Sequence, residues 1–272
     1  MKQIDFSKVL NDDQVYSHMM DNYDQLGRDW IVHQWNWMNN VYKAFKDHYK
    51  YLIVISLVEK TLQFYDQMNI QYSFDQFYSK SYLQIDKFSI TELCEKLQLP
   101  KETVRRKVLE LEKLGVLKRQ KKQIIIDRSV FSQVKPENQI KLTSKYICLI
   151  SQIFNKDKIY LKKLDASYIE KVIKKNFSLC WRWFYRMQIP MIIGYHEKFE
   201  DLATFHVWGT VAMNQAFNYK KTKRTNINSL TPDYNNFNEG LLEKEGPSTG
   251  VSAMSLSDMT GIPRATVIRK CK

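Results

Sequence analysis

Residues 88–126 carry the clearest periodic pattern of apolar and polar positions in the chain. Their first part has apolar residues at i, i+3 and i+7, the spacing of one face of a short amphipathic helix: Ile90, Leu93 and Leu97. Ser89 is suited to be its N-cap, and Glu92 three residues later would complete a capping box. The helix is predicted to end before Pro100, because proline disfavours helical geometry in the residue before it.

A second helix is predicted from about Lys101 to Leu114, with four apolar residues facing inward: Val104, Val108, Leu111 and Leu114. Gly115 would end it, since a glycine adopts the left-handed conformation that follows many helices. Two short strands around a basic tip come next, at 116–119 and 123–127. The predicted order is therefore helix, turn, helix and β-hairpin.

This order resembles the winged helix-turn-helix of bacterial transcription regulators of the MarR and IclR type. The resemblance depends on two patterns in the sequence: Ile90-x-x-Leu93-Cys94-x-x-Leu97-x-Leu99-Pro100 and Thr103-Val104-x-Arg106-x-Val108-x-x-Leu111-x-x-Leu114-Gly115-Val116-Leu117. It implies that the second helix enters a major groove and that the wing contacts the flanking backbone. The DNA-binding residues implied for this motif are Lys101, Glu102, Thr103, Arg105, Arg106, Lys107, Lys118, Arg119, Lys121 and Lys122.

The end of the chain repeats the helix-turn-helix pattern when Pro263 is aligned with Pro100. The alignment matches Leu256 with Leu93, Ile262 with Leu99, Thr266-Val267 with Thr103-Val104, and Arg269-Lys270 with Arg106-Lys107. Gly261 lies at the predicted turn. The corresponding DNA-binding residues are Arg264, Thr266, Arg269 and Lys270. Because Lys272 falls midway through the predicted recognition helix, we expect a truncated chain, and the alternative is that the protein ends there.

Aromatic-rich stretches precede both motifs. Residues 28–68 contain no Gly or Pro and predict one or two long helices, and residues 146–176 also look helical, followed by a helical block that Pro190 breaks or kinks. Two aromatic patterns recur: Trp35-x-Trp37 with Trp181-x-Trp183, and Phe45-(x3)-Tyr49-(x2)-Leu52 with Tyr195-(x3)-Phe199-(x2)-Leu202. These repeats predict a tandem duplication of a helical block and a winged helix.

The predicted fold is therefore mainly α with a small β-wing, the second winged helix-turn-helix being incomplete. We divide the chain into an N-terminal arm (1–27), a helical block with the first motif (28–130), and a linker, second helical block and second motif (131–272). Residues 69–87 are expected to be a polar-aromatic connector and 128–145 a linker containing Pro136, and the Gly-, Pro- and Asn-containing 220–250 is the one clear candidate for a low-order segment.

Charge favours an anionic partner. Lys and Arg number 42 against 29 Asp and Glu, a net charge of +13. Residues 101–122 alone hold nine Lys/Arg and three Glu, so about half of the excess lies on the first motif. The net charge indicates nucleic acid or an acidic membrane surface as the partner, and its concentration on a candidate DNA-binding element favours nucleic acid.

The aromatic blocks allow two interpretations. Aromatic residues at helical spacing form a core or a dimer interface in most proteins, and the alternative is a pocket for a small-molecule effector. Trp35 and Trp37 lie two apart on a helix and point in nearly opposite directions, so burial of both requires a helix packed on two sides.

Other chemistry finds little support. His196, Glu197, Glu200 and His206 form a His/acid cluster, but Glu200 stands where the second His of a His-Glu-x-x-His zinc motif belongs. The four cysteines lack metal-ligand spacing. With eight glycines and no phosphate loop or nucleophile motif, we expect no enzyme, no cofactor and no metal. The first residues lack a signal-peptide pattern and the longest apolar run is too short for a bilayer, which predicts a cytoplasmic protein without a membrane partner.

The favoured function is sequence-specific binding of double-stranded DNA by a transcription regulator, as a monomeric pseudo-dimer of two winged helices or as a homodimer. The alternatives are a plasmid-type replication initiator, which also carries tandem winged helices, and a winged-helix scaffold for protein contacts.

Overall fold

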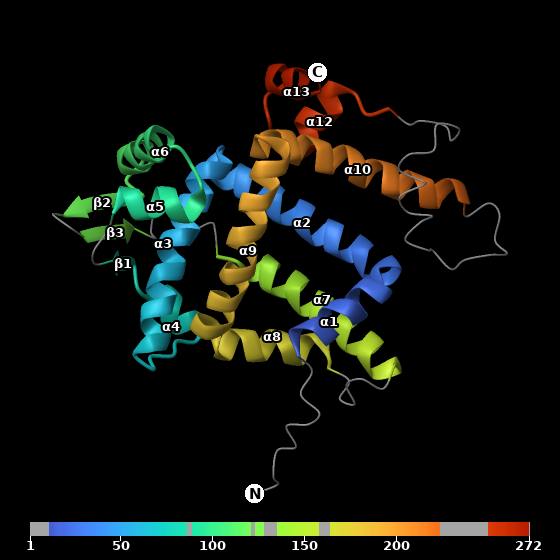
Figure 1. The fold of residues 1–272 in the computed structure, drawn as a ribbon, viewed down its shortest axis with the longest axis horizontal. Helices are drawn as coiled ribbons and strands as arrows, with labels where there is room; N and C mark the ends of the chain where they lie inside the picture. Colours follow the sequence, from blue (N-terminus) through green and yellow to red (C-terminus); the bar gives the residue numbers. More distant parts are fainter. Residues whose placement is uncertain are drawn as a thin grey trace, which may run out of the picture.

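The protein was analysed as a computed structural model, in which residues 11–85, 89–120, 123–127, 135–157, 164–223 and 250–271 are described. It is mainly helical with one small antiparallel sheet (Figure 1). The elements up to the sheet are α1 (Asp12–Asp21), α2 (Tyr23–Phe45), α3 (His48–Gln67), α4 (Phe74–Ser79), β1 (Tyr82–Ile85), α5 (Ile90–Leu97), α6 (Lys101–Lys113), β2 (Leu117–Gln120) and β3 (Gln123–Asp127). The later elements are α7 (Glu137–Lys156), α8 (Ala166–Lys175), α9 (Phe177–Phe199), α10 (Leu202–Lys223), α12 (Ala253–Thr260) and α13 (Arg264–Lys270).

The first helical block consists of two long helices joined by a short break at Lys46 and Asp47. Lys46 adopts the left-handed conformation (φ 52°), and Asp47 caps α3 by accepting hydrogen bonds from the backbone N–H groups of Tyr49 and Lys50. The break therefore needs neither Gly nor Pro. Helix α2 begins before Gly27 and continues through it, so the predicted boundary of the arm at residue 27 falls inside a helix.

The first motif forms the predicted order of elements. Helices α5 and α6 are followed by the β2–β3 hairpin, and Gly115 has the expected positive φ of 74°. Two details differ from prediction. Leu114 is the exposed C-cap of α6 (55% exposed) and lies outside the inward stripe, and Glu92 forms an ion pair with Lys60 in place of a capping box.

The sheet has the strand order β1–β3–β2, with both pairs antiparallel. Its inner face consists of five buried residues: Leu83, Ile85, Leu117, Ile124 and Ile126. Strand β1 and helix α4 lie in residues 69–87, the predicted polar-aromatic connector. Neither element was predicted there, because elements of four and six residues are too short to show a periodic apolar pattern.

Two other predicted interruptions are helical in the structure. Pro136 caps α7, so the predicted linker 128–145 is helical from Glu137 onward. Pro190 lies inside α9, which is a continuous helix of 23 residues. Most of 220–250 lies outside the described residues.

A constant offset in residue number relates the two helical blocks. Helices α8, α9 and α10 begin at the same distance along the chain after α1, α2 and α3, as the first residues show (Asp12 and Ala166, Tyr23 and Phe177, His48 and Leu202). We call this spacing the block offset. Helices α12 and α13 likewise follow α5 and α6 at one slightly larger spacing, the motif offset (Ile90 and Ala253, Lys101 and Arg264).

The predicted aromatic matches do not follow either offset. The block offset is the distance in sequence from Tyr23 to Phe177, the first residues of α2 and α9. Trp35 and Trp181 are separated by fewer residues than this, so they do not occupy equivalent positions in the two helices. The helix caps, rather than the aromatic residues, mark the register.

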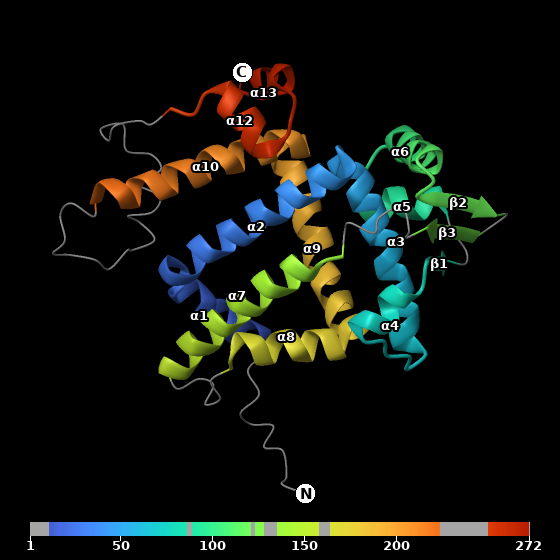
Figure 2. The same ribbon diagram turned by 180° about the vertical axis from the view of Figure 1, so that it is seen from behind.

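The two blocks pack against each other reciprocally (Figure 2). Helix α3 packs against α9, and α10 packs against α2. Trp37 Nε1 donates to Tyr51 Oη on α3 (3.0 Å), whereas Trp35 Nε1 donates to Thr210 Oγ1 on α10 (3.1 Å). Helix α2 therefore contacts helices on two sides, with Trp37 buried and Trp35 half-buried.

Phe177, at the start of α9, is fully buried among aromatic rings. Its ring stacks on Trp181 at 5.3 Å and meets Phe74 and Phe77 edge-on or tilted at 5.2 Å each. Backbone and side-chain hydrogen bonds between Tyr72 and Ser178 close the same contact. This cluster joins α4 to the second block, and its rings act as core.

We expect Phe177→Ala to lower the free energy of unfolding by about 3–5 kcal/mol, because it leaves a cavity between packed rings. Urea unfolding followed by circular dichroism measures this change. Trp183→Ala is the matched control, since Trp183 lies on the same helix and is 57% exposed. Equal losses in the two variants would contradict the assignment of Phe177 to the core.

Two buried histidines meet where the blocks join. His48 Nε2 and His206 Nδ1 lie 3.1 Å apart, and His206 Nε2 is 2.8 Å from Asn39 Oδ1. Burial lowers the pKa of His48 to about 4, against the opposing effect of Asp47 and Asp201. Burial, and then the neighbouring His48, lower the pKa of His206 to about 3.

These pKa values predict a decrease of stability in acid. The unfolded histidines protonate near pH 6.5, whereas the folded ones stay neutral until about pH 4, so stability present above pH 6.5 declines as pH falls toward 4. His206→Gln, which does not titrate, should make the decline shallower. Urea unfolding at a series of pH values tests this, and an unchanged pH dependence in the variant would contradict it.

Candidate nucleic-acid interface

Helix α6 presents its first two turns to solvent. Gln98 takes the left-handed conformation (φ 53°) and Pro100 precedes the first turn, so the chain reverses sharply between α5 and α6. Leu97, Leu99 and Val104 are buried beneath this turn. The outward positions hold four of the predicted DNA-binding residues: Lys101, Glu102, Arg105 and Arg106. Thr103 is half-buried at the side of the helix.

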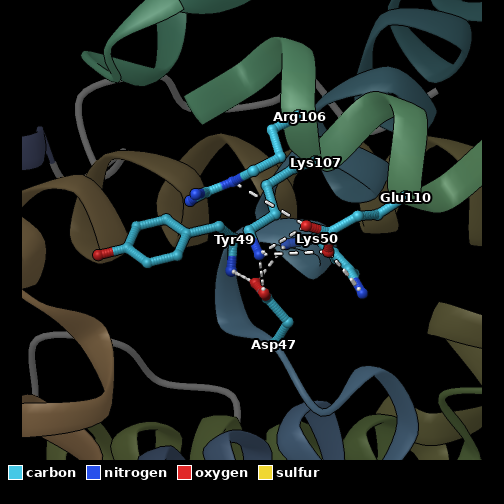
Figure 3. A network of polar contacts seen from close by, with 6 residues as sticks. All are labelled: Asp47, Tyr49, Lys50, Arg106, Lys107 and Glu110. Carbon is cyan, nitrogen blue, oxygen red and sulfur yellow. Dashed lines mark hydrogen bonds and ion pairs between the residues drawn. The ribbon is translucent and has the colours of Figure 1, made fainter. Parts of the chain in front are cut away.

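Lys107 has a different environment, shown in Figure 3. Its Nζ lies 2.5 Å from Asp47 Oδ2 and 3.3 Å from Glu110 Oε2, and its side chain is only 13% exposed. Lys50 also reaches Glu110, at 2.9 Å. Lys107 therefore faces the start of α3 and fixes α6 to it, although the sequence suggested that it contacts DNA.

The same network keeps Glu110 ionised. Burial raises the pKa of Glu110. The hydrogen bonds and positive charges of Lys50 and Lys107 lower it by a larger total amount, so the net shift is downward. Arg106 lies at the edge of this network, with Nε 4.0 Å from Glu110 and a side chain that is 63% exposed. It remains accessible to a partner.

Helix α13 repeats this arrangement. Lys270 Nζ lies 2.7 Å from Asp201 Oδ2, and Asp201 accepts hydrogen bonds from the backbone N–H and hydroxyl of Thr204 at the start of α10. Burial raises the pKa of Asp201, but the Lys270 and Thr204 hydrogen bonds bring it below its usual value. Asp47 and Asp201 are related by the block offset, and Lys107 and Lys270 by the motif offset.

Exposure along the two helices also agrees. Val267 is buried like Val104, and Thr266 is half-buried like Thr103. Arg264 and Arg269 are exposed and form no ion pair with a described residue, which is also true of Arg105. Helices α6 and α13 both lie toward the upper edge of Figures 1 and 2, and α8 lies at the opposite end.

The described basic residues of the wing have intramolecular partners. Arg119 donates from Nε and Nη2 to the two carboxylate oxygens of Glu112 (2.5 and 2.7 Å), which raises its pKa. Lys118 lies 3.3 Å from Asp127 and 5.6 Å from the centre of the Tyr82 ring, yet it is 53% exposed. Lys121 and Lys122 lie outside the described residues.

Sequence reasoning missed the aspartates that organise both motifs. Asp47 and Asp201 each precede a long helix, and an Asp before an apolar run is an N-cap signal in the sequence. Lys46 was also missed: its Nζ lies 3.7 Å from the position that a Cβ on Gly261 would take. The end of α2 therefore reaches the turn of the second motif.

The His/acid cluster is dispersed. His196 Nδ1 lies 3.1 Å from Tyr49 Oη, whereas His206 faces His48 and Asn39. Within the described ranges no three His, Cys, Asp or Glu side chains gather as metal ligands. Across the same ranges, no helix combines the length and apolar character needed to cross a bilayer.

The two neighbouring cations of α6 give a matched test of this assignment. Lys107→Gln should lower the free energy of unfolding by about 1–3 kcal/mol, because the carboxylate of Asp47 would be left without a partly buried partner. Arg106→Gln should change it by no more than about 0.5 kcal/mol, since its ion pair is long and exposed. Chemical unfolding measures both, and the reverse ranking would show that Lys107 does not anchor the helix.

No protein-family model, curated protein or solved structure matches this chain. The described part of the chain presents two exposed basic helices, each fixed by an aspartate that caps a long helix.

Proposed function

We propose that this protein binds double-stranded DNA sequence-specifically, as a transcription regulator whose two helix-turn-helix motifs form a pseudo-dimer within one chain. The observation that carries the proposal is the recurrence of one arrangement on α6 and α13. Each helix follows a tight turn and a proline, buries one valine near its start, exposes its N-terminal cations and is fixed by a Lys–Asp ion pair. An exposed helix of this kind can enter a major groove.

A tandem duplication explains the constant offsets. Two of the equivalent pairs have identical lengths, ten residues in α1 and α8 and 23 in α2 and α9, whereas α3 and α10 have 20 and 22 residues. Helix α2 is equivalent to α9, and α3 is equivalent to α10. If each helix is exchanged for its equivalent, the contact of α3 with α9 becomes the contact of α10 with α2, and both contacts are present. The packing thus supports an approximate two-fold relation, which would present two recognition helices to successive turns of a duplex.

The predicted DNA-binding residues fall into two proposed roles. The exposed and half-buried residues are proposed to contact phosphates and base edges: Lys101, Glu102, Thr103, Arg105 and Arg106 on α6, and Arg264, Thr266 and Arg269 on α13. Lys107 and Lys270 are proposed to position the helices through their ion pairs. In the wing, Lys118 and Arg119 would exchange an intramolecular carboxylate for a phosphate of the backbone.

A winged helix used for protein contacts would not need exposed cations at both sites. Net charge is +13, and Arg105, Arg264 and Arg269 have no ion-pair partner among the described residues. An exposed cation without an intramolecular partner can neutralise a DNA phosphate and release the counterion bound there. Salt-dependent duplex binding is therefore the property that separates the two functions.

We expect Arg105→Ala/Arg106→Ala to weaken duplex binding about 10-fold or more and to reduce the slope of log K against log salt by about 0.9 for each phosphate that is no longer neutralised. Fluorescence anisotropy across a salt series measures both quantities. Lys171→Ala/Lys175→Ala is the matched control, because it removes two exposed positive charges from α8, at the other end of the molecule. Equal affinity and slope for the α6 variant and the wild type would contradict the proposal.

A further inference from the structure

Helices α6 and α13 differ in chemistry at two equivalent exposed positions. Glu102 and Arg105 on α6 correspond to Ala265 and Ile268 on α13 at the motif offset. All four side chains are exposed, and Ile268 is 40% exposed. Each pair lies at i and i+3, so its members are neighbours on one helix face.

The equivalence is fixed on both sides of these positions. Before them, Pro100 and Pro263 cap the helices, each after a turn with one positive φ (Gln98, 53°; Gly261, 71°). After them, Lys107 and Lys270 hold each helix to the aspartate that precedes α3 or α10. The two helices therefore have the same register, and the difference lies in the side chains alone.

The remaining exposed positions keep their chemistry. Lys101 corresponds to Arg264 and Arg106 to Arg269, so a cation is present in both helices, and a threonine is present at 103 and 266. Cations and hydroxyls at these equivalent positions would make the same kinds of contact, to phosphates or to base edges, in both halves of a site. A difference between the two halves of a site would therefore come from the positions at which the helices differ, 102/265 and 105/268.

The two pairs suit different base pairs. An arginine donates two hydrogen bonds to O6 and N7 of guanine, and a glutamate accepts from N4 of cytosine. Alanine and isoleucine side chains have no hydrogen-bonding group, and in the major groove the apolar feature that they can contact is the methyl group of thymine. The charged pair favours G·C, and the apolar pair favours A·T.

We propose that the protein recognises an asymmetric site, in which Glu102 and Arg105 contact a G·C-containing half and Ala265 and Ile268 contact thymine methyl groups in an A·T-containing half. This inference rests on the proposed function. A chain with two unlike recognition helices binds such a site in one orientation only. A symmetric homodimer on a symmetric site has two equivalent orientations and cannot distinguish the two directions along the DNA.

Selection of duplexes from a random library tests the proposal with two reciprocal variants. The wild type should enrich a site with two unlike halves whose centres lie about one helical turn apart. Ala265→Glu/Ile268→Arg should convert the A·T half toward the sequence of the other half, and Glu102→Ala/Arg105→Ile should do the converse. For the wild type, replacement of the contacted G·C pair should weaken binding about 5- to 150-fold.

The control adds the same two charges away from the motif: Tyr168→Glu/Val172→Arg, at exposed positions on α8. It should select the wild-type site. Thermal unfolding of each variant, followed by circular dichroism, confirms that the exposed substitutions leave the fold intact.

The outcomes separate the two levels of the proposal. Two identical halves, enrichment of one half alone, or unchanged selection by both α6 and α13 variants overturns the asymmetric site while leaving DNA binding in place. No enrichment of any duplex, together with binding that does not depend on salt, overturns the proposed function as well.

Discussion

The arrangement of both motifs depends on one kind of contact, in which a single aspartate serves two elements. Asp47 accepts the first backbone N–H groups of α3 and also pairs with Lys107 on α6. Asp201 has the same two kinds of partner, the start of α10 and Lys270. Because the capping hydrogen bonds already restrict the aspartate, the ion pair costs little additional entropy for that side chain, and it sets the position of the exposed helix on the long one.

The long helices then determine how the two exposed helices relate to each other. Helix α3 packs against α9 and α10 against α2, so each motif is attached to a helix that contacts the other block. A core shared in this way need not be symmetric within one chain. The His48–His206 contact shows this, since the positions equivalent to these histidines at the block offset are Leu202 and Leu52.

The sequence predicted helix ends best where a proline or glycine stands at the end of an apolar stripe, whereas Gly27 and Pro190 lie inside helices. Pro100, Pro263 and Gly115 marked helix ends correctly, because each restricts its own or its neighbour's backbone. It predicted least where the deciding partner is distant. The break at residues 46 and 47 has no Gly or Pro, and the removal of Lys107 from the exposed face depends on Asp47, which precedes the whole of α3. Helical periodicity identifies the polar face of a helix such as α6. It does not reveal which charged side chain of that helix, here Lys107, already forms an ion pair with another element.

The pairs at 102/105 and 265/268 are exposed and form no ion pair with a described residue, so the described part of the fold places little constraint on them. Val104 and Val267 each fill a closed core, and Lys107 and Lys270 each neutralise a capping carboxylate, so a change at any of them would cost stability. Side chains that face solvent carry no such cost. In two linked motifs the exposed positions are therefore the ones that can diverge while the framework stays the same, and a difference confined to them changes what the protein contacts rather than how it folds.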